Sequence, residues 1–355
     1  MRPRTEPVKW AAAGARVTMD DVAREAGVSR ALVSLVMRES PKVSDKRRQR
    51  VLAVAERLGY WPNAMARGLA SRRTRTVGVL LNELHNPFYA EVLDGIDEES
   101  ERLGYRVLIA SAGARPRGEE RAVEAFLEYR TDGIVLVGPR LPAAAIAGLA
   151  AAVPVVVVAR GVRSGMVDSV ANDDYKGVSE VVRHLAALGH TRIAHIDGGS
   201  GAGASSRRTA FVRAMRDNGL EAGTQVVPGD YTDRAGARAV ERLLAVGGLP
   251  SAICAANDFV AAGAIDRLQI EGLRVPADVS VVGYDDVFLA GLRGISLTTV
   301  NQPRPEMGRI ALAAVVERIE GGRTEAVHVR LTPELVVRSS TAPPNPNRLR
   351  ACSSL

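Results

Sequence analysis

Residues Thr18 to Met37, TMDDVAREAGVSRALVSLVM, contain two short amphipathic patterns separated by Ala26-Gly27-Val28. Thr18 can cap a first helix, and Asp21 stands three positions later, as in a capping box. Ser29 can cap a second helix directly after the glycine turn. The stretch therefore predicts two helices that meet at a steep angle across a tight turn.

The second predicted helix has an apolar side and a polar side. Its expected inward residues are Leu32, Val33, Val36 and Met37, and its expected outward residues are Arg30, Ala31, Ser34 and Arg38. Such a helix can lie in the major groove of DNA with its first turn nearest the base edges. An ordinary helical hairpin inside a core has the same pattern, so the pattern alone leaves both interpretations open.

The charge distribution favours DNA. Residues 1–76 contain 17 Lys and Arg against 7 Asp and Glu, whereas the other 279 residues contain 30 against 33. The whole excess of positive charge therefore lies in the segment that holds the two helices. Basicity confined to one segment is typical of a surface that binds phosphates.

Two further helices are predicted before the composition changes. Ser44 can cap a helix over 45–58, and its expected buried residues are Val51, Leu52, Ala55 and Leu58. Asn63 can cap a short helix over 64–70. Seven residues are too few for a stable isolated helix in water, so this segment should fold only against a partner.

Length and composition bound the rest of the chain. A chain of 355 residues is expected to form two or three folded units. Its two cysteines, Cys254 and Cys352, give neither a disulfide framework nor a zinc spacing, which favours a cytoplasmic protein. Residues 1–16 are expected to be a disordered leader, and no run approaches the ~20 apolar residues of a transmembrane helix.

From residue 77 onward, β-rich runs alternate with helical patterns. The predicted strands are 77–81, 106–111, 133–137, 155–159, 192–197, 252–256, 279–284 and 327–330. Near-continuous apolar strands with helical crossovers predict parallel sheets covered on both faces. Ligand sites in such sheets lie at the carboxyl ends of the strands, where this chain has Asn86, Phe88, Arg160, Asn257 and Asp285.

Six ordered motifs then make the chain from Val17 to about Arg338 resemble a LacI/GalR-type transcriptional repressor. They are VTMDDVAREAGVSRALVSLVM, PNAMARGLA, NPFY, LGHTRIAHI, AAND and VPADVSVVGYDD. The resemblance implies a helix-turn-helix headpiece over 17–61, a hinge helix and linker over 62–75, and a core over 76–338. That core would be α/β, with two Rossmann-like lobes of the periplasmic-binding-protein type and three crossings between them. The first lobe would hold about 76–173 and 302–331, and the second about 174–301 and 332–340.

The resemblance also assigns contacts with double-stranded operator DNA. The implied DNA-binding residues are Thr18, Ser29, Arg30, Ala31, Ser34, Asn63, Ala66 and Leu69. Arg30 suits guanine, whereas Ala31 can only contact a thymine methyl group. Leu69 would insert from the minor groove into a central base step, although ordinary packing is its alternative. Leu35 departs from an Arg that is common in the family, so part of the polar readout is missing.

In the cleft between the lobes, the resemblance implies a small-molecule effector, for which a sugar or a nucleoside fits best. The implied effector-binding residues are Asn86, Phe88, Arg160, Asp173, Arg207, Asn257, Asp285 and Gln302. A purely structural role is an equal alternative for Asp173, Arg160 and Gln302. The Asp-Asn pair of the family is replaced here by Asp173-Asp174, which adds a charge. No catalytic residue, metal or cofactor is expected, and the regulator would act in the cytoplasm, at the nucleoid.

Two other classes of protein share parts of this sequence pattern. Gly199-Ser-Gly201-Ala-Gly203-Ala204 follows a predicted strand and fits a dinucleotide-binding fingerprint, but it lies mid-chain and no acidic residue ends the next strand. A periplasmic sugar receptor would have a similar core but no basic headpiece.

Residues 339–355 contain three prolines and no heptad pattern, so they are expected to be a disordered tail. Without heptads the tail cannot form a C-terminal coiled coil that would join dimers into a tetramer. The expected assembly is therefore a homodimer.

Overall fold

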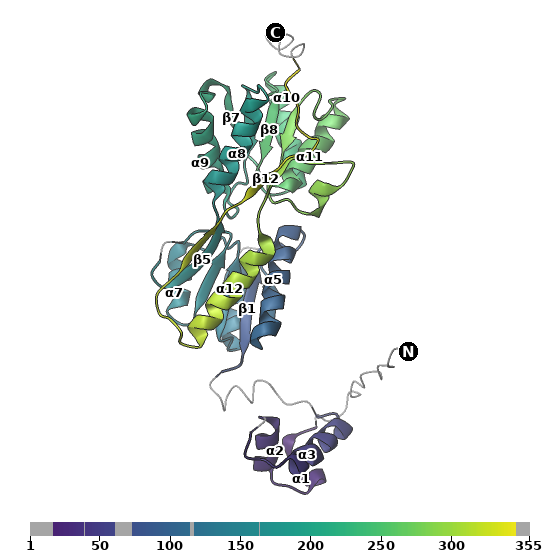
Figure 1. The fold of residues 1–355 in the computed structure, drawn as a ribbon, viewed down its shortest axis with the longest axis vertical. Coiled ribbons are helices and arrows are strands. Elements are labelled where there is room, and N and C mark those ends of the chain that lie inside the picture. Colours follow the sequence, from purple (N-terminus) through teal and green to yellow (C-terminus); the bar gives the residue numbers. More distant parts are fainter. Residues whose placement is uncertain (1–16, 39, 61–72, 114–116, 163, 346–355) are drawn as a thin grey trace. The chain divides into compact units, whose positions relative to one another are not determined.

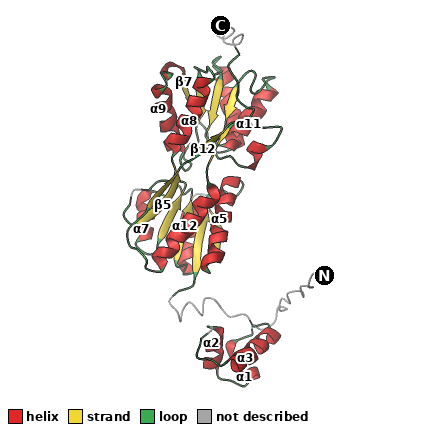
Figure 2. Ribbon diagram, viewed as in Figure 1, coloured by secondary structure: helices red, strands yellow, loops and turns green. Residues whose placement is uncertain are grey.

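The computed structural model describes residues 17–38, 40–60, 73–113, 117–162 and 164–345. The chain forms two compact units, Met1–Thr74 and Arg75–Leu355. The described part of the first unit is helical, whereas the second contains two parallel sheets covered by helices (Figures 1 and 2). The predicted combination of a helical headpiece and a two-lobe α/β core is confirmed. In these described ranges, every helix is too short or too polar to span a bilayer.

The first unit contains α1 (Met19–Ala26), α2 (Arg30–Met37) and α3 (Asp45–Leu58). The predicted capping box closes α1, because the Thr18 side chain accepts from Asp21 N and the Asp21 carboxylate accepts from Thr18 N at 2.9 Å. Gly27 ends this helix at φ +62°, a conformation that favours glycine. The Ser29 hydroxyl then accepts from Leu32 N at 3.2 Å and starts α2.

The core of this unit is small and made mostly of valine and alanine. Its buried residues are Val22, Ala23, Ala26, Val33, Val36, Val43, Val51 and Ala55. Two expectations for α3 are wrong. Leu52 was expected to be buried but is 46% exposed, because Val54 packs partly against the core on the other side of the helix. Ser44 occupies the N-cap position, yet its side chain makes no capping hydrogen bond.

The first lobe of the second unit is built on a six-stranded parallel sheet with the order β11-β5-β4-β3-β1-β2. The strands are β1 (Thr76–Leu81), β2 (Arg106–Ser111), β3 (Gly133–Val137), β4 (Val155–Val158), β5 (Val167–Asn172) and β11 (His328–Leu331). Helices α5 (Pro87–Leu103) and α12 (Arg304–Ile319) cover one face, and α6 (Gly118–Glu128) and α7 (Ala143–Ala150) cover the other.

The second lobe repeats this layering around a parallel sheet with the order β7-β6-β8-β9. Its strands are β6 (Ile193–Ile196), β7 (Thr224–Val227), β8 (Ala252–Ala255) and β9 (Ser280–Val282). Helices α8 (Asp174–Ala187) and α9 (Ala204–Asp217) cover one face, and α10 (Asp233–Ala245) and α11 (Asp258–Ile270) cover the other. The short turns η1 (Glu221–Gly223) and η2 (Phe288–Gly291) and an antiparallel pair, β10 (Thr299–Asn301) and β12 (Glu334–Val336), complete this lobe.

The chain passes between the two lobes three times, after β5, after β10 and after β11 (Figure 1). Backbone hydrogen bonds join two of the crossings to each other and the third to the loop that contains Asp285. Asp173 N donates to the carbonyl of Leu331 at 2.9 Å, and Gln302 N donates to the carbonyl of Asp285 at 3.4 Å. The carboxyl ends of both sheets therefore meet at these crossings.

Glycines allow the helices that cover each sheet to approach closely. A Cβ at Gly95 of α5 would lie 1.9 Å from the carbonyl oxygen of Pro305, and one at Gly308 of α12 would lie 2.0 Å from that of Val92. The second lobe has the same arrangement, since Gly236 of α10 and Gly263 of α11 pack against each other's backbones. Each lobe thus contains a helix pair whose contact requires glycine on both sides.

The expectation of a disordered tail is wrong for residues 339–345, which pack on the second lobe. Ser340 is 2% exposed, and its hydroxyl donates to the carbonyl of Val281 at 2.6 Å. The two ring nitrogens of His190 lie 2.9 Å from Ser251 Oγ and from the Ala342 carbonyl oxygen, respectively. These polar contacts hold the segment against the ends of the sheet.

Candidate functional site

The exposed side of α2 is the candidate DNA-reading surface. Arg30 and Ala31 are exposed and Ser34 is half-buried, as expected for groups that remain free to reach a ligand. Arg30 lies 3.8 Å from Asp20, and its side chain remains 67% exposed. Leu35 instead packs partly against the helical core. The first turn of α2 therefore offers one guanidinium and one methyl group to a base edge.

The structure gives Thr18 and Ser29 a capping role. The Thr18 hydroxyl binds Asp21, and Ser29 caps α2. Two other arginines of the unit are paired with carboxylates: Arg24 binds Asp21 at 3.2 Å, and Arg57 binds Glu25 at 2.7 Å. The other DNA-binding residues expected from the sequence, Asn63, Ala66 and Leu69, lie outside the described residues.

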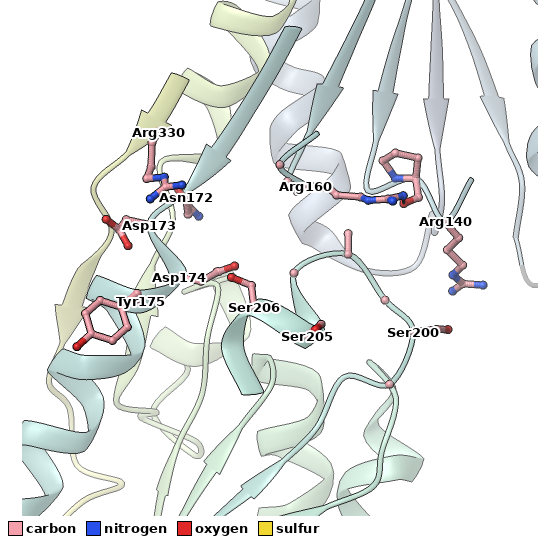
Figure 3. Close-up of a pocket in the computed structure, with 17 residues that line it drawn as sticks. Arg140, Arg160, Asn172, Asp173, Asp174, Tyr175, Ser200, Ser205, Ser206 and Arg330 are labelled. Carbon is pink, nitrogen blue, oxygen red and sulfur yellow. Dashed lines mark hydrogen bonds between the residues drawn. The ribbon is translucent and has the colours of Figure 1, made fainter. Parts of the chain in front are cut away.

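A cavity of ≈ 520 Å³ lies where the carboxyl ends of the two sheets face each other (Figure 3). Its volume falls in the ordinary range for small-molecule sites. Arg160 and Asp173 are among its lining residues, which are Pro139, Arg140, Ala159, Arg160, Gly161, Asn172, Asp173, Asp174, Tyr175, Gly199, Ser200, Gly201, Ala202, Gly203, Ser205, Ser206 and Arg330. The second lobe contributes the glycine-rich loop after β6 together with the first turns of α8 and α9.

A smaller recess of ≈ 20 Å³ adjoins this cavity, because Ala159 and Ala202 line both. It brings together five of the expected effector residues, and its lining is Asn86, Phe88, Tyr89, Ala159, Ala202, Arg207, Tyr231, Asn257 and Asp285. The rings of Phe88 and Tyr89 meet edge to face with centroids 5.4 Å apart. The recess has room for about one water molecule. The recess alone is therefore too small for an organic ligand, and the adjoining cavity supplies the volume of the candidate site.

Arg207 is the most heavily bonded polar residue of the recess. Its Nε donates to Asp174 Oδ1 at 3.1 Å, and its Nη1 donates to the carbonyl of Ala256 at 2.7 Å. The guanidinium lies over the Tyr284 ring at 3.9 Å from the centroid, a cation–π contact. Burial lowers the pKa of Arg207, but the surrounding tyrosines and carboxylates outweigh it and leave the pKa raised. Arg207 is thus a permanent, rigidly held cation.

Asp285 lies next to the Arg207 guanidinium and is itself buried. Its Oδ1 lies 3.7 Å from Arg207 Nη1 and accepts a hydrogen bond from the Gln302 side chain. Burial raises the pKa of Asp285 to about 6, although Arg207 and Arg304 oppose that rise. Asp285 also has φ +120°, a strained conformation for a residue with a side chain. Such strain is typical of functional positions.

The remaining expected effector residues also have structural partners. Asn86 caps α5, Asn257 caps α11 by accepting from Val260 N at 2.9 Å, and Asp173 caps α8 by accepting from Lys176 N at 3.0 Å. Arg160 donates to the carbonyls of Pro139 and Leu141. Gln302 is buried and does not line the cavity, but it bonds both Asn172 and Asp285. These hydrogen bonds support a structural role for Asp173, Arg160 and Gln302.

Sequence reasoning missed the aromatic groups that surround Arg207. Tyr231 lines the recess and donates to the Ala202 carbonyl at 2.7 Å, and Tyr284 donates to Asp174 at 3.3 Å. Tyr284 directly precedes Asp285, which the sequence predicted to be a site residue. The position of Tyr284 at the end of a predicted strand could therefore have indicated Tyr284 as well. Tyr231 carries no such signal, because it stands in a loop after β7, a strand that was not predicted.

Comparison with known proteins identifies both parts of the chain. The family described as "Bacterial regulatory proteins, lacI family" matches residues 18–63, and "Periplasmic binding protein-like domain" matches 182–341. The HTH-type transcriptional regulator DegA of Bacillus subtilis (strain 168) is 34% identical over 336 residues, which is 93% of this chain and 99% of DegA. The chain belongs to the lacI family. This lacI-family protein is therefore a transcriptional regulator rather than an enzyme, which rules out the nicotinamide-enzyme alternative.

Solved structures of the lacI family have the same fold. The Lac repressor dimer bound to operator and the anti-inducer ONPF has a TM-score of 0.81 and 29% identity, covering 92% of this chain and 99% of that chain. The complex of the transcriptional regulator CelR with cellobiose has a TM-score of 0.69 and 32% identity, covering 92% and 100% respectively. Both neighbours span the headpiece and the core.

Proposed function

We propose that this lacI-family regulator is a repressor that binds a pseudo-palindromic operator as a homodimer and is controlled by a small hydroxylated molecule, a sugar or a nucleoside. The observation that carries the proposal is a polar cavity between two lobes in the same chain as a helix-turn-helix with an exposed second helix, set in a strongly basic segment over residues 1–76. Such a regulator works in the cytoplasm, at the nucleoid. Two neighbours support the proposal, since one is described as a dimer on its operator and the other as a cellobiose complex.

The DNA half of the proposal rests on the surface of α2. Arg30 is the exposed cation at the start of this helix, and its long side chain can donate two hydrogen bonds to a guanine. Ala31 can only make an apolar contact with a thymine methyl group, and Leu35 packs partly against the helical core. Direct readout is therefore limited to few base pairs, and we expect DNA bending by the two hinge segments to supply part of the specificity.

The effector half rests on the mixture of groups in and around the recess. Carboxylate, amide and guanidinium groups from Asp285, Asn257 and Arg207 can both donate to and accept from hydroxyl groups. Phe88 adds an aromatic surface on which the apolar side of a sugar ring can pack. The ligand would lie between the lobes and alter their relative orientation. It can control DNA binding only if it binds the two lobe arrangements with different affinities.

The DNA function is tested by selecting duplexes from a random library with the full chain and measuring their affinities by fluorescence anisotropy. Arg30→Ala should weaken the selected site by about 1–3 kcal/mol relative to a scrambled duplex. The matched control is Arg57→Ala, which removes an exposed arginine of α3 that pairs with Glu25. Affinity should fall with salt at a log-log slope of about −0.9 per neutralised phosphate. A failure to enrich any sequence, or an affinity independent of salt, contradicts the DNA function.

The effector function is tested by a thermal-shift screen of sugars and nucleosides on the full chain, followed by anisotropy with the best ligand. Asp285→Ala should lose the ligand response and keep its affinity for the selected duplex, because the headpiece is a separate compact unit. A variant that still responds normally would remove Asp285 from the effector site. Removal of residues 1–74 should abolish DNA binding and retain ligand binding, which distinguishes a regulator from a transport receptor.

A further inference from the structure

Asp174 and Arg207 form a nearly buried ion pair at the edge of the cavity. The side chain of Arg207 is 8% exposed and that of Asp174 is 12% exposed, with Nε and Oδ1 separated by 3.1 Å. The Tyr284 hydroxyl donates to the same Asp174 oxygen at 3.3 Å. In Figure 3, Asp174 faces the cavity beside Ser206. The carboxylate thus contacts both the cation of the recess and the space a ligand would fill.

The positive charge of Arg207 is compensated by neighbouring carboxylates, so it attracts an anionic ligand only weakly. Of its three nitrogens, Nε binds Asp174 and Nη1 binds the Ala256 carbonyl and lies 3.7 Å from Asp285. Two carboxylates therefore flank Arg207. Arg304 also acts on Asp285 but is itself paired with Glu91 at 2.8 Å, so with both aspartates ionised the cluster carries a net negative charge. In a water-poor recess such a charge repels an anion more strongly than it would in bulk solvent.

The same cluster is well suited to hydroxyl groups. The carboxylate oxygens of Asp174 and Asp285 can accept hydrogen bonds from hydroxyls, and the free Nη2 hydrogens of Arg207 can donate to them. The Asp174 carboxylate is also held in place, because Oδ1 accepts from Arg207 Nε at 3.1 Å and from the Tyr284 hydroxyl at 3.3 Å. A neutral polyol can satisfy these groups without leaving any charge unpaired, whereas an acid cannot.

The outer wall of the cavity has the opposite sign. Arg140, Arg160 and Arg330 line it, and Arg140 and Arg330 are exposed at its rim. Solvent screens these rim arginines, and Arg160 already binds two carbonyl groups. They can attract anions weakly to the rim, so a test must separate rim binding from binding at Arg207.

We infer that Asp174 determines the charge of the effector: by neutralising Arg207, it restricts the site to uncharged hydroxylated ligands and excludes sugar acids and sugar phosphates. This inference rests on the proposed effector function and narrows it to a chemical class. Asp174 is a specificity-determining residue here, because it would contact the ligand and also set the charge of its neighbour.

The test compares two single-charge variants of the full chain. Asp174→Asn keeps the shape and the hydrogen bonds to Arg207 and Tyr284 but removes the charge. The matched control, Glu180→Gln, removes one negative charge from the same helix, α8, at a position that does not line the cavity or the recess. Glutamine favours helices about as well as glutamate, so the control should fold normally. Asp174→Ser is a second neutral variant in case the first does not fold.

Titration calorimetry would measure the affinities of matched ligands that share a ring. The pairs are glucose and glucuronate, galactose and galacturonate, and ribose and ribose 5-phosphate, with inorganic phosphate as a further anion. The wild-type chain and Glu180→Gln should bind a neutral member at least about tenfold more tightly than its acidic partner. In Asp174→Asn or Asp174→Ser this ratio should fall by at least about tenfold, and phosphate should bind more tightly than to the wild type.

Three results would overturn the inference. They are a wild-type preference for the acidic member, an equal change of the ratio in Glu180→Gln and Asp174→Asn, and no gain of anion affinity in either neutral variant at position 174. Affinity for the selected duplex is measured in parallel and should be the same in all variants. Loss of DNA binding by the wild type would count against the proposed function, whereas the charge inference is judged by the probe ratios alone.

Discussion

Gln302 donates a hydrogen bond from its side-chain amide to the buried carboxylate of Asp285. The carbonyl oxygen of the same side chain accepts from Asn172, the last residue of β5. Gln302 therefore joins Asp285 of the second lobe to β5 of the first lobe at one of the crossings. A ligand that engages Asp285 would compete with one of the two hydrogen bonds in this link.

Asp285 should make stability depend on pH. Its pKa is about 6 in the folded chain, because burial raises it from 3.8. Between these pH values the unfolded chain releases a proton that the folded chain keeps, so the free energy of unfolding should fall as pH rises. Asp285→Asn lacks this group, and the wild-type minus variant difference should decline by at most about 3 kcal/mol across the window. Urea unfolding at several pH values measures it.

The pH comparison needs the variant because other buried groups titrate in the same window. Burial lowers the pKa of His195 to about 4, so its contribution to stability increases with pH, in the opposite direction. That contribution is present in both proteins and cancels in the difference. Asp258 also has a raised pKa, caused by burial and by Asp285, so part of the decline belongs to this pair. A difference that is flat or rises with pH would contradict the burial argument.

Gly308→Ala should destabilise the first lobe. The new methyl group would lie 2.0 Å from the carbonyl oxygen of Val92, so α5 and α12 would have to separate. We expect a loss of about 1–3 kcal/mol in the free energy of unfolding. Gly148→Ala is the control, since this exposed glycine of α7 has no atom within 4 Å of its Cβ position. It should be neutral or stabilise by up to about 1 kcal/mol, and equal effects would contradict the close-packing argument.

Thr18→Ala should destabilise the helical unit. It removes the hydroxyl that accepts from Asp21 N and donates to the Asp21 carboxylate. The expected loss is about 1 kcal/mol, typical of an N-cap. Ser44→Ala is matched, because Ser44 occupies an N-cap position without a side-chain hydrogen bond, and its effect should stay within about 0.5 kcal/mol. Thermal unfolding of residues 1–74 by circular dichroism compares them, and equal losses would show that the hydroxyl bond contributes nothing.

Leu69→Ala tests the hinge, which stays a prediction from the sequence. If Leu69 enters a base step, removing its side chain should weaken the selected duplex by a few kcal/mol, because the bent DNA loses its wedge. Affinity for the effector in the absence of DNA should not change. Anisotropy and calorimetry on the same preparation measure both. Unchanged DNA affinity would reduce Leu69 to a packing residue.

Local signals in the sequence predicted much of the fold. The pattern over 45–58 predicted α3 with the bounds that the structure has, and the β-rich runs 106–111 and 133–137 correspond to β2 and β3. The capping box at Thr18 was predicted because its partner stands only three residues away. These features depend on neighbours in the chain, which a sequence displays directly.

Elements that depend on distant partners were missed. Strand β5 contains Asp168, which looks like a loop residue but is 1% exposed because Arg323 binds both of its oxygens, at 2.8 and 2.7 Å. Strands β10 and β12 have three residues each and pair only after the chain has left the second lobe and returned. In the same way, strand ends indicated Asn257 and Asp285, but the pairing of Arg207 with Asp174 requires the folded second lobe.

The three crossings also decide how the core can be divided. Residues between the first and second crossings form most of the second lobe, and the chain returns to each lobe once more afterwards. A single protease cut in one crossing would leave the lobes covalently joined through the other two. Neither lobe corresponds to one continuous fragment, so expressing either alone would require rejoining segments that the gene keeps apart.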